Sequence, residues 1–517
     1  MCHSTPIRSI GQKYRQATSA QSRVVIVRGG APDPVRAPSS IVAGEPAWVD
    51  RRGIIRTSNS VHVSPLPDVI RAYMRAHGLT KHEEMARVLG VDRTLVSKYL
   101  TGARDCRDVL QLRHFAQAMD LPPETFGLME LPQSMPVDPA DTVADWRFVR
   151  RTLNRNRHEL TTTAARLYWD SVPIEGTTCI TRPNWMAPVP LDLDSIRLEF
   201  DDDAPPPMCD GTEVESEPYR PMRPNGLSRY TRYSQAVRAI ARPTLFENRT
   251  SYRLLDVSLD ESGGRMAFGS TTYFDMVDVC EVIAHETAAV WTAHRGASRI
   301  TLDDLPFRNR VGDLFDPRRR PILPSINTLT VRRAPEGDTF FLHRRGSNSV
   351  TLAAGLTHII PAGVFQPAAI GQVNMSRDFS LWRNMIREFS EEFLDTPEHD
   401  GSGGTPVDYD IEPLRTLTEA RAAGKVRAWC FGVGLDPLAP AGEILTAVII
   451  DSDVFDSTFE GLVSRNSEGE MYPSEDGTLG IRWTSENVRR VLNREPLAAA
   501  AAACVALTWR HRATLLA

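Results

Sequence analysis

Three acidic side chains lie close together in the segment Arg387-Glu388-Phe389-Ser390-Glu391-Glu392. On a helix, residues three and four positions apart share a face, so Glu388, Glu391 and Glu392 are expected to cluster. Clustered carboxylates repel one another unless a cation or a nearby arginine balances them. Such a group suits a hard divalent metal such as magnesium, which binds oxygen ligands and can hold the diphosphate of a substrate.

A second segment whose residues could bind a partner covers residues 79–102. Its pattern predicts two short helices joined by a tight turn. Thr80 and Glu83 are spaced as a capping pair that would start the first helix. Gly90 would end it, because the turn requires a residue that tolerates positive φ. Asp92 can cap the second helix by accepting hydrogen bonds from free backbone N–H groups.

The side chains of the predicted second helix divide into two faces. The apolar ones would be buried against the first helix, where Ala86 is small enough to allow a close approach: Val91, Val96 and Tyr99. The polar ones would be exposed and can hydrogen-bond to base edges or phosphates: Arg93, Thr94, Ser97 and Lys98. This distribution is what a helix lying in the major groove of DNA requires.

The segment resembles the Cro-repressor (XRE-type) helix-turn-helix family. The residues that carry the resemblance are Glu83-Glu84-Met85-Ala86, Leu89-Gly90-Val91-Asp92, Val96-Ser97 and Gly102. The flanks agree, with apolar residues on a preceding helix, on a following helix and on a closing one: Val69, Ile70 and Met74; Leu110, Leu112, Phe115, Ala116 and Met119; and Leu121 to Phe126. The resemblance implies an all-α helix-turn-helix domain over residues 64–130.

The same resemblance implies double-stranded DNA as the partner. The implied DNA-binding residues are Lys81, His82, Arg93, Thr94, Ser97, Lys98, Arg104 and Arg107. Arg93, Thr94 and Lys98 match the positions that the family uses for bases, whereas Arg104 and Arg107 suit phosphate contacts. His82 and Leu100 depart from the family, which commonly has Gln and an acidic residue there. Since one domain reads only a few base pairs, we expect a homodimer; the alternative is a four-helix protein-binding scaffold.

The acidic segment resembles the Nudix box, whose core reads R-E-U-x-E-E after a strand and a glycine-rich turn. Pro361-Ala362-Gly363 stands where that turn would be, and the predicted strand–strand–helix–strand order suits a Nudix-like α/β sandwich. The resemblance implies that Glu388, Glu391 and Glu392 are magnesium ligands and that Arg387 orients them. No Glu occurs between Gly363 and Arg387, however, and this interval is longer than in the family. We therefore favour a degenerate pocket that senses a nucleotide-type effector; the alternative is a magnesium-dependent nucleoside diphosphate (Nudix) hydrolase with an attached DNA-binding domain.

Two further groups favour structural interpretations. Cys280, His285 and Glu286 contain the residue types of a nucleophile–base pair, but the apolar residues around them indicate a half-buried helix. Arg318, Arg319 and Arg320 are flanked by prolines and are interpreted as a solvated linker. No catalytic residue is assigned, and we expect a regulator and not an enzyme.

The composition of the chain and its turn-forming residues predict the class of protein and the domain boundaries around these segments. The chain has 517 residues, of which 41% are hydrophobic and 24% charged, a balance typical of globular domains. The seven cysteines are scattered without a C-x-x-C pair, which indicates reduced thiols and a cytoplasmic protein. No apolar run reaches the roughly 20 residues that a membrane helix needs. The predicted architecture is multidomain: a flexible basic arm (1–60), the helix-turn-helix domain (64–130), a linker (131–144), an α+β region (145–320), the Nudix-like domain (321–490) and a tail (491–517).

Overall fold

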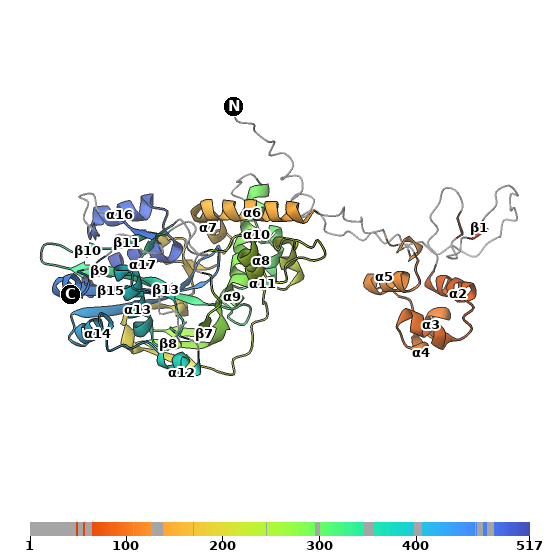
Figure 1. Cartoon of the computed structure of the whole chain (residues 1–517), viewed down its shortest axis with the longest axis horizontal. Helices are drawn as coiled ribbons and strands as arrows, with labels where there is room; N and C mark the ends of the chain where they lie inside the picture. Colours follow the sequence, from red (N-terminus) through yellow and green to blue (C-terminus); the bar gives the residue numbers. More distant parts are fainter. Residues whose placement is uncertain are drawn as a thin grey trace, which may run out of the picture. The chain divides into compact units, whose positions relative to one another are not determined.

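The computed structural model describes residues 48–49, 55–56, 65–106, 108–121, 123–126, 128, 138–168, 170–243, 246–294, 300–345, 356–369, 371–397, 406–460, 462, 469–472 and 480–517. These residues form two compact units, one within Arg23–Val137 and one within Asp138–Ala517 (Figure 1). The predicted basic arm, 1–60, lies outside the described residues except for β1 (Trp48–Val49) and β2 (Ile55–Arg56), which pair antiparallel.

The first unit is helical over residues 65–126. Its elements are α2 (Leu66–Ala76), α3 (His82–Leu89), α4 (Arg93–Leu100), α5 (Val109–Ala118) and a 3₁₀ turn, η1 (Pro123–Phe126). One hydrophobic core joins all five elements, and Ile70, Met85, Leu89, Val96 and Phe115 are fully buried in it. The apolar spacing that predicted these helices therefore describes their inward faces.

The start of α3 differs from the predicted capping pair. Lys81 is the first residue before the helix, and Glu84 accepts hydrogen bonds from the backbone N–H groups of Thr80 and Lys81, each at 3.1 Å. The helix thus begins one residue later than the pairing of Thr80 with Glu83 required. These hydrogen bonds hold the pKa of Glu84 below its usual range. Glu83 is left on the exposed side of the helix.

The second unit is built on a mixed sheet of nine strands. They run in the order β17-β10-β9-β15-β14-β4-β3, with β13 also pairing with β9 and β5 with β14. Strands β9 and β15 are parallel, and the other neighbours are antiparallel. Their bounds are β3 (Val172–Pro173), β4 (Ile180–Thr181), β5 (Met186–Asp192), β9 (Pro324–Arg333), β10 (Thr339–Phe340), β13 (Ala362–Val364), β14 (Val426–Leu435), β15 (Gly442–Asp451) and β17 (Ile481–Arg482).

Helices cover both faces of this sheet, because its central strands are apolar on both sides. On β15, Leu445 and Ile449 belong to the core beneath the C-terminal helices, whereas Ile444 and Val448 belong to the opposite core. Figure 1 shows α16 and α14 on opposite sides of the sheet. The helices are α16 (Ser485–Arg494), α17 (Ala499–Arg510) and α18 (Arg512–Leu515) on one face, and α13 (Leu381–Leu394), α14 (Leu414–Ala422) and α15 (Ser452–Thr458) on the other.

Two smaller sheets and a buried helix complete this unit. The sheets are β6-β8-β7 and β12-β11-β16. Helix α10 continues from a π-helical turn, η6, and is buried on all sides from Val282 to Val290, including its polar residues His285, Glu286 and Thr287. The bounds are β6 (Ile196–Phe200), β7 (Thr250–Leu259), β8 (Gly264–Thr272), β11 (Leu342–Arg345), β12 (Thr357–Ile359), β16 (Gly469–Met471), α6 (Pro139–Arg155), α7 (Arg157–Ala165), α8 (Tyr233–Ile240), α9 (Tyr273–Met276), η6 (Val277–Glu281), α10 (Val282–Ala293), α11 (Pro306–Val311) and α12 (Gln372–Arg377).

The domain boundaries after residue 130 differ from those predicted. Helix α6 begins at Pro139, inside the expected linker. No boundary occurs at residue 320, because β3, β4 and β5 belong to the same sheet as the strands that follow it. The expected tail is a layer of the core: Ala501, Cys504 and Val505 of α17 are fully buried.

Two further expectations concerned the state of the cysteines and the presence of a membrane-spanning helix. Cys106, Cys179, Cys209, Cys280, Cys430 and Cys504 are buried free thiols. Among the described residues, no helix has the length and apolar character to cross a membrane.

Candidate functional site

The turn between α3 and α4 has the geometry that its residues predicted. Gly90 adopts a left-handed conformation, with φ of 64°, and ends α3. Asp92 precedes α4 and accepts a hydrogen bond from the backbone N–H of Thr94 at 2.6 Å. Hydrogen bonding from the side chain of Thr94 and from its backbone N–H lowers the pKa of Asp92, so the cap is an anion at neutral pH. The turn therefore fixes where α4 starts and which of its residues face outward.

Helix α4 separates its apolar and polar residues as expected. Val96 and Tyr99 are buried, and the ring of Tyr99 makes an edge contact with Phe115 of α5. The side chains on the other side are exposed, or half-buried in the case of Ser97: Arg93, Thr94, Ser97 and Lys98. Helix α4 thus exposes a row of hydrogen-bonding and cationic groups, while its apolar side is packed into the core of the unit.

An ion pair that the sequence analysis did not identify links the two helices. Arg93 Nη1 donates to Glu83 Oε1 at 3.0 Å. Glu83 is available for this contact because Glu84, and not Glu83, caps α3. The linear pattern contained no signal for the pair, since a one-residue change in the start of α3 exchanges the two glutamates.

The remaining predicted DNA-binding residues flank this face. Lys81 immediately precedes α3 and is exposed, and His82 at its first position is half-buried. Arg104 is exposed, and its backbone N–H donates to the carbonyl of Lys98, which holds the segment after α4 near the last turn of the helix. Arg107 lies outside the described residues.

In α13, Arg387 is buried and holds a neighbouring segment. Its Nη2 donates to the carbonyl of Gln366 at 2.8 Å and to Asn384 Oδ1 at 2.9 Å. Its Nη1 lies 3.4 Å from Asp378 Oδ2, and Asp378 also accepts from the hydroxyl of Tyr409 at 2.8 Å. These contacts attach α13 to residues 366–378, so they give Arg387 a role different from orienting the glutamates.

The glutamates of α13 face strand β13. Glu392 is buried, and its Oε1 accepts from the backbone N–H of Ala362 at 3.1 Å. Glu388 lies over Gly363 so closely that a Cβ at that glycine would stand 1.9 Å from the Glu388 Cδ. A side chain at position 363 would therefore displace the Glu388 carboxylate, and Glu391 is half-buried nearby on the same helix.

This arrangement does not fit the predicted magnesium site. A metal held by the three glutamates requires their oxygens to converge on one point. Within the described part of the chain, no three His, Cys, Asp or Glu side chains gather in a group that could hold a metal ion. The buried Glu392 is directed to a backbone N–H group, which is a structural use of its carboxylate.

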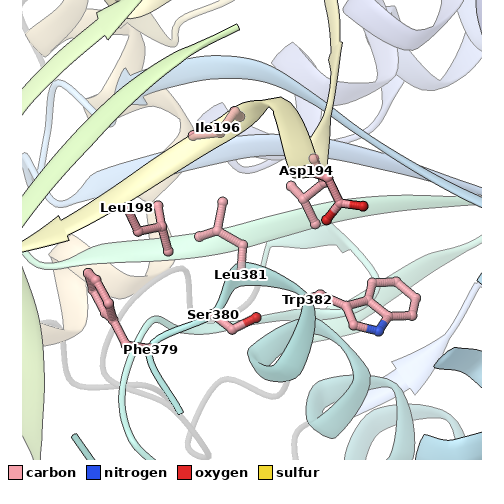
Figure 2. Close-up of a pocket in the computed structure, with 8 residues that line it drawn as sticks. Asp194, Ile196, Leu198, Phe379, Ser380, Leu381 and Trp382 are labelled. Atoms are coloured by element: carbon pink, nitrogen blue, oxygen red, sulfur yellow. The ribbon is translucent and has the colours of Figure 1, made fainter. Parts of the chain in front are cut away.

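A small pocket opens at the start of α13. Figure 2 shows Phe379, Ser380 and Leu381 of this segment facing Ile196 and Leu198 of β6. The pocket has a volume of about 210 Å³ and is also lined by Leu193, Asp194 and Trp382. Ligand pockets usually enclose roughly 300 to 1,000 Å³. The lining includes no basic side chain, so the pocket lacks the groups that would hold a diphosphate.

Several buried charged residues surround η6 and α10. Glu281 is fully buried and paired with Arg150 Nη1 and with Arg157 Nη2, the latter at 3.2 Å. Burial opposes its ionisation, but the two guanidinium groups hold the pKa of Glu281 below its usual range. Tyr233 donates to or accepts from His285 Nδ1 at 2.9 Å, and burial lowers the pKa of His285 to about 3.

Part of the groups assigned from sequence to a half-buried helix and a solvated linker is more enclosed than predicted: Glu286 and Arg320 are fully buried, whereas Arg318 is exposed as expected. Burial raises the pKa of Glu286 to about 7, although its carboxylate accepts from the backbone N–H groups of Phe307 and Arg308. Arg308 and Arg320 are fully buried and donate to backbone carbonyls, for example Leu438 and Leu314. Cys280 is also fully buried, and burial raises the pKa of its thiol to about 11, which leaves it protonated and poorly nucleophilic.

Comparisons with protein-family models and with curated proteins found no match to this chain.

Proposed function

We propose that the chain is a sequence-specific DNA-binding transcriptional regulator that reads duplex DNA through α4 of a helix-turn-helix domain. The observation that carries this proposal is the exposed row formed by Arg93, Thr94 and Lys98 on a helix whose other side is buried through Val96 and Tyr99. The left-handed Gly90 and the Asp92 cap support it, because they set the sharp turn on which a recognition helix depends.

In the proposed mechanism, α4 enters the major groove with its N-terminal end directed to the base edges. Arg93 and Thr94 are the first two residues of the helix, so they would reach bases, together with Lys98 one turn later. Lys81 and Arg104 would contact phosphates on either side, which adds salt-dependent affinity without sequence preference. A homodimer would place two such helices about one turn of DNA apart.

We propose a sensing role for the second unit, as a Nudix-like sandwich with a nucleotide-type effector. The mixed sheet between α13 and α17 supports the sandwich. The hydrogen bonds of Glu392 and Arg387 to backbone groups favour sensing over hydrolysis. A hydrolase would need the glutamate carboxylates to converge on one metal ion and the arginine to orient them. An effector would act only if it binds the DNA-competent and DNA-incompetent states with different affinities.

The test is a selection from a random duplex library with the purified full-length protein at modest salt. We expect a short enriched sequence, two-fold symmetric if the protein is a dimer, and its loss in Arg93→Ala/Lys98→Ala. The fold should survive, since both side chains are exposed. A folded protein that enriches no sequence would refute the proposal, and cleavage of nucleoside diphosphate derivatives that is lost in Glu391→Gln would favour the hydrolase instead.

A further inference from the structure

The ion pair between Glu83 and Arg93 lies on the surface that we propose to read DNA. The two side chains retain 55% and 69% of their exposure, so the pair is in solvent and not in the core. Exposed pairs of this kind add little to stability. Its larger effect is therefore expected on the charge and the donors of Arg93.

Glu83 does not cap helix α3. The two N–H groups at its start, those of Thr80 and Lys81, are satisfied by Glu84. Glu83 is also not among the buried residues of this unit. Its carboxylate lies in the first turn of α3, where it is favourable to the helix dipole, and it also stands beside the first residue of α4.

A carboxylate at this position changes how arginine can bind DNA. Arginine binds phosphates through its charge and guanine through two N–H groups that reach O6 and N7. Glu83 occupies Nη1 and offsets the charge of Arg93, which weakens attraction to any phosphate. Among the described residues, no other hydrogen bond of the Arg93 side chain is seen, so Nη2 and Nε remain for a directional contact.

We propose that Glu83 is a specificity-determining residue that restrains Arg93 from phosphates and directs it to a guanine in the major groove. It acts through Arg93 and is therefore a positioning residue. The inference rests on the proposed function and deepens it, since it assigns a base to one position of the recognised sequence.

The experiment compares full-length wild type with Glu83→Gln in library selection and in binding to a duplex without the selected sequence, at several salt concentrations. In Glu83→Gln, non-specific affinity should rise several-fold, and the slope of log K against log salt should steepen by about 0.9, the effect of one additional phosphate contact. The preference for guanine at one position should fall about tenfold, because Arg93 can then turn to the backbone.

Two matched variants make the result specific. Asp68→Asn removes the same charge from another exposed pair of this unit, Asp68 with Arg71 at 2.9 Å, and should leave the base preference unchanged. In an Arg93→Lys background, which lacks the fork of N–H groups, Glu83→Gln should no longer alter base preference.

The outcomes separate the inference from the proposed function. A wild-type protein that selects a sequence, with the same base preference in Glu83→Gln, overturns the role of Glu83 and leaves DNA reading intact. A wild-type protein that selects no sequence overturns both. Loss of guanine preference in Glu83→Gln alone, with Asp68→Asn unchanged, supports the inference.

Discussion

Two charged helices of this chain use similar residues in opposite ways. Helix α4 presents Arg93 and Lys98 to solvent. Helix α13 buries Arg387 and Glu392 against backbone groups and neighbouring side chains of its own unit. In the sequence, the charged residues of the two helices look equally suited to a functional site. In the structure, those of α4 form part of the surface, whereas those of α13 hold segments of the interior together.

The difference teaches that the surroundings of a charged group decide its role. A buried charge must be paired or hydrogen-bonded, since leaving it unsatisfied is costly, and this requirement consumes its donors or acceptors. An exposed charge is weakly held and keeps them for a partner. Substitutions of the buried charges in η6, α10 and α13 should therefore affect stability, and substitutions in α4 should affect binding.

The largest effect on stability is expected at Glu281. Glu281→Gln leaves Arg150 and Arg157 without their shared carboxylate in a fully buried site, which should lower the free energy of unfolding by about 3 to 5 kcal/mol. Denaturant unfolding followed by tryptophan fluorescence reports mainly on this unit, because eight of the nine tryptophans of the chain lie in it and the other is Trp48. Glu159→Gln on the exposed side of α7 is the control and should change little; equal effects of the two variants would contradict the comparison.

A smaller loss is expected at Glu392. Glu392→Ala removes the acceptor of the buried Ala362 N–H group and should cost about 1 to 3 kcal/mol, whereas Glu392→Gln keeps an oxygen there and should cost less. The same fluorescence unfolding experiment measures both. If the two variants are equally unstable, the hydrogen bond to Ala362 is not what Glu392 contributes.

The pH dependence of the large unit should carry a contribution from His285. Burial lowers its pKa to about 3, so the unfolded chain binds a proton below pH 6.5 that the folded chain does not. Stability is then lost as the pH falls from 6.5 toward 3, by about 1.4 kcal/mol per unit. Wild type should lose this stability relative to His285→Asn, which does not titrate; parallel stability curves for the two proteins would refute the assignment.

The smallest effect is expected at the turn before α4. Gly90→Ala places a side chain at a φ of 64°, which should cost about 1 kcal/mol, or about a fivefold loss of amide protection in α3 and α4 by hydrogen exchange. Protection in the large unit should not change. Unaltered protection in α3 and α4 would mean that the turn tolerates a β-carbon without strain.

Local sequence patterns predicted the elements well. The amphipathic pattern of residues 381–394 predicts a helix and the apolar run of residues 426–435 predicts a strand, and both elements have these ends in the structure. The segment Pro335-Glu336-Gly337-Asp338 predicts a hairpin turn, and it joins β9 to β10. Apolar periodicity and turn residues act over a few positions, so a linear pattern contains them. The two faces of α4 could be predicted for the same reason.

Contacts between distant segments could not be predicted in this way. Cys430 of β14 pairs with Leu191 of β5, more than 200 residues earlier in the chain. Arg387 forms an ion pair with Asp378, and the sequence pattern around the two residues does not predict it. For this reason the sequence predicted a domain boundary at residue 320, whereas strands from both sides of that residue join one sheet. The pair of Glu83 with Arg93 was missed for a smaller reason, the one-residue shift in the start of α3.

The position of α17 has a consequence for how the protein is made. Residues 499–510 cover Leu329, Leu445 and Ala447, which form one face of the central sheet. While a ribosome is still adding them, that apolar face is bare, whereas the helices between residues 65 and 126 already have their complete core. A shortened chain that stops before Ala499 should consequently be recovered as aggregates and degraded by proteases, with only its N-terminal helices surviving digestion.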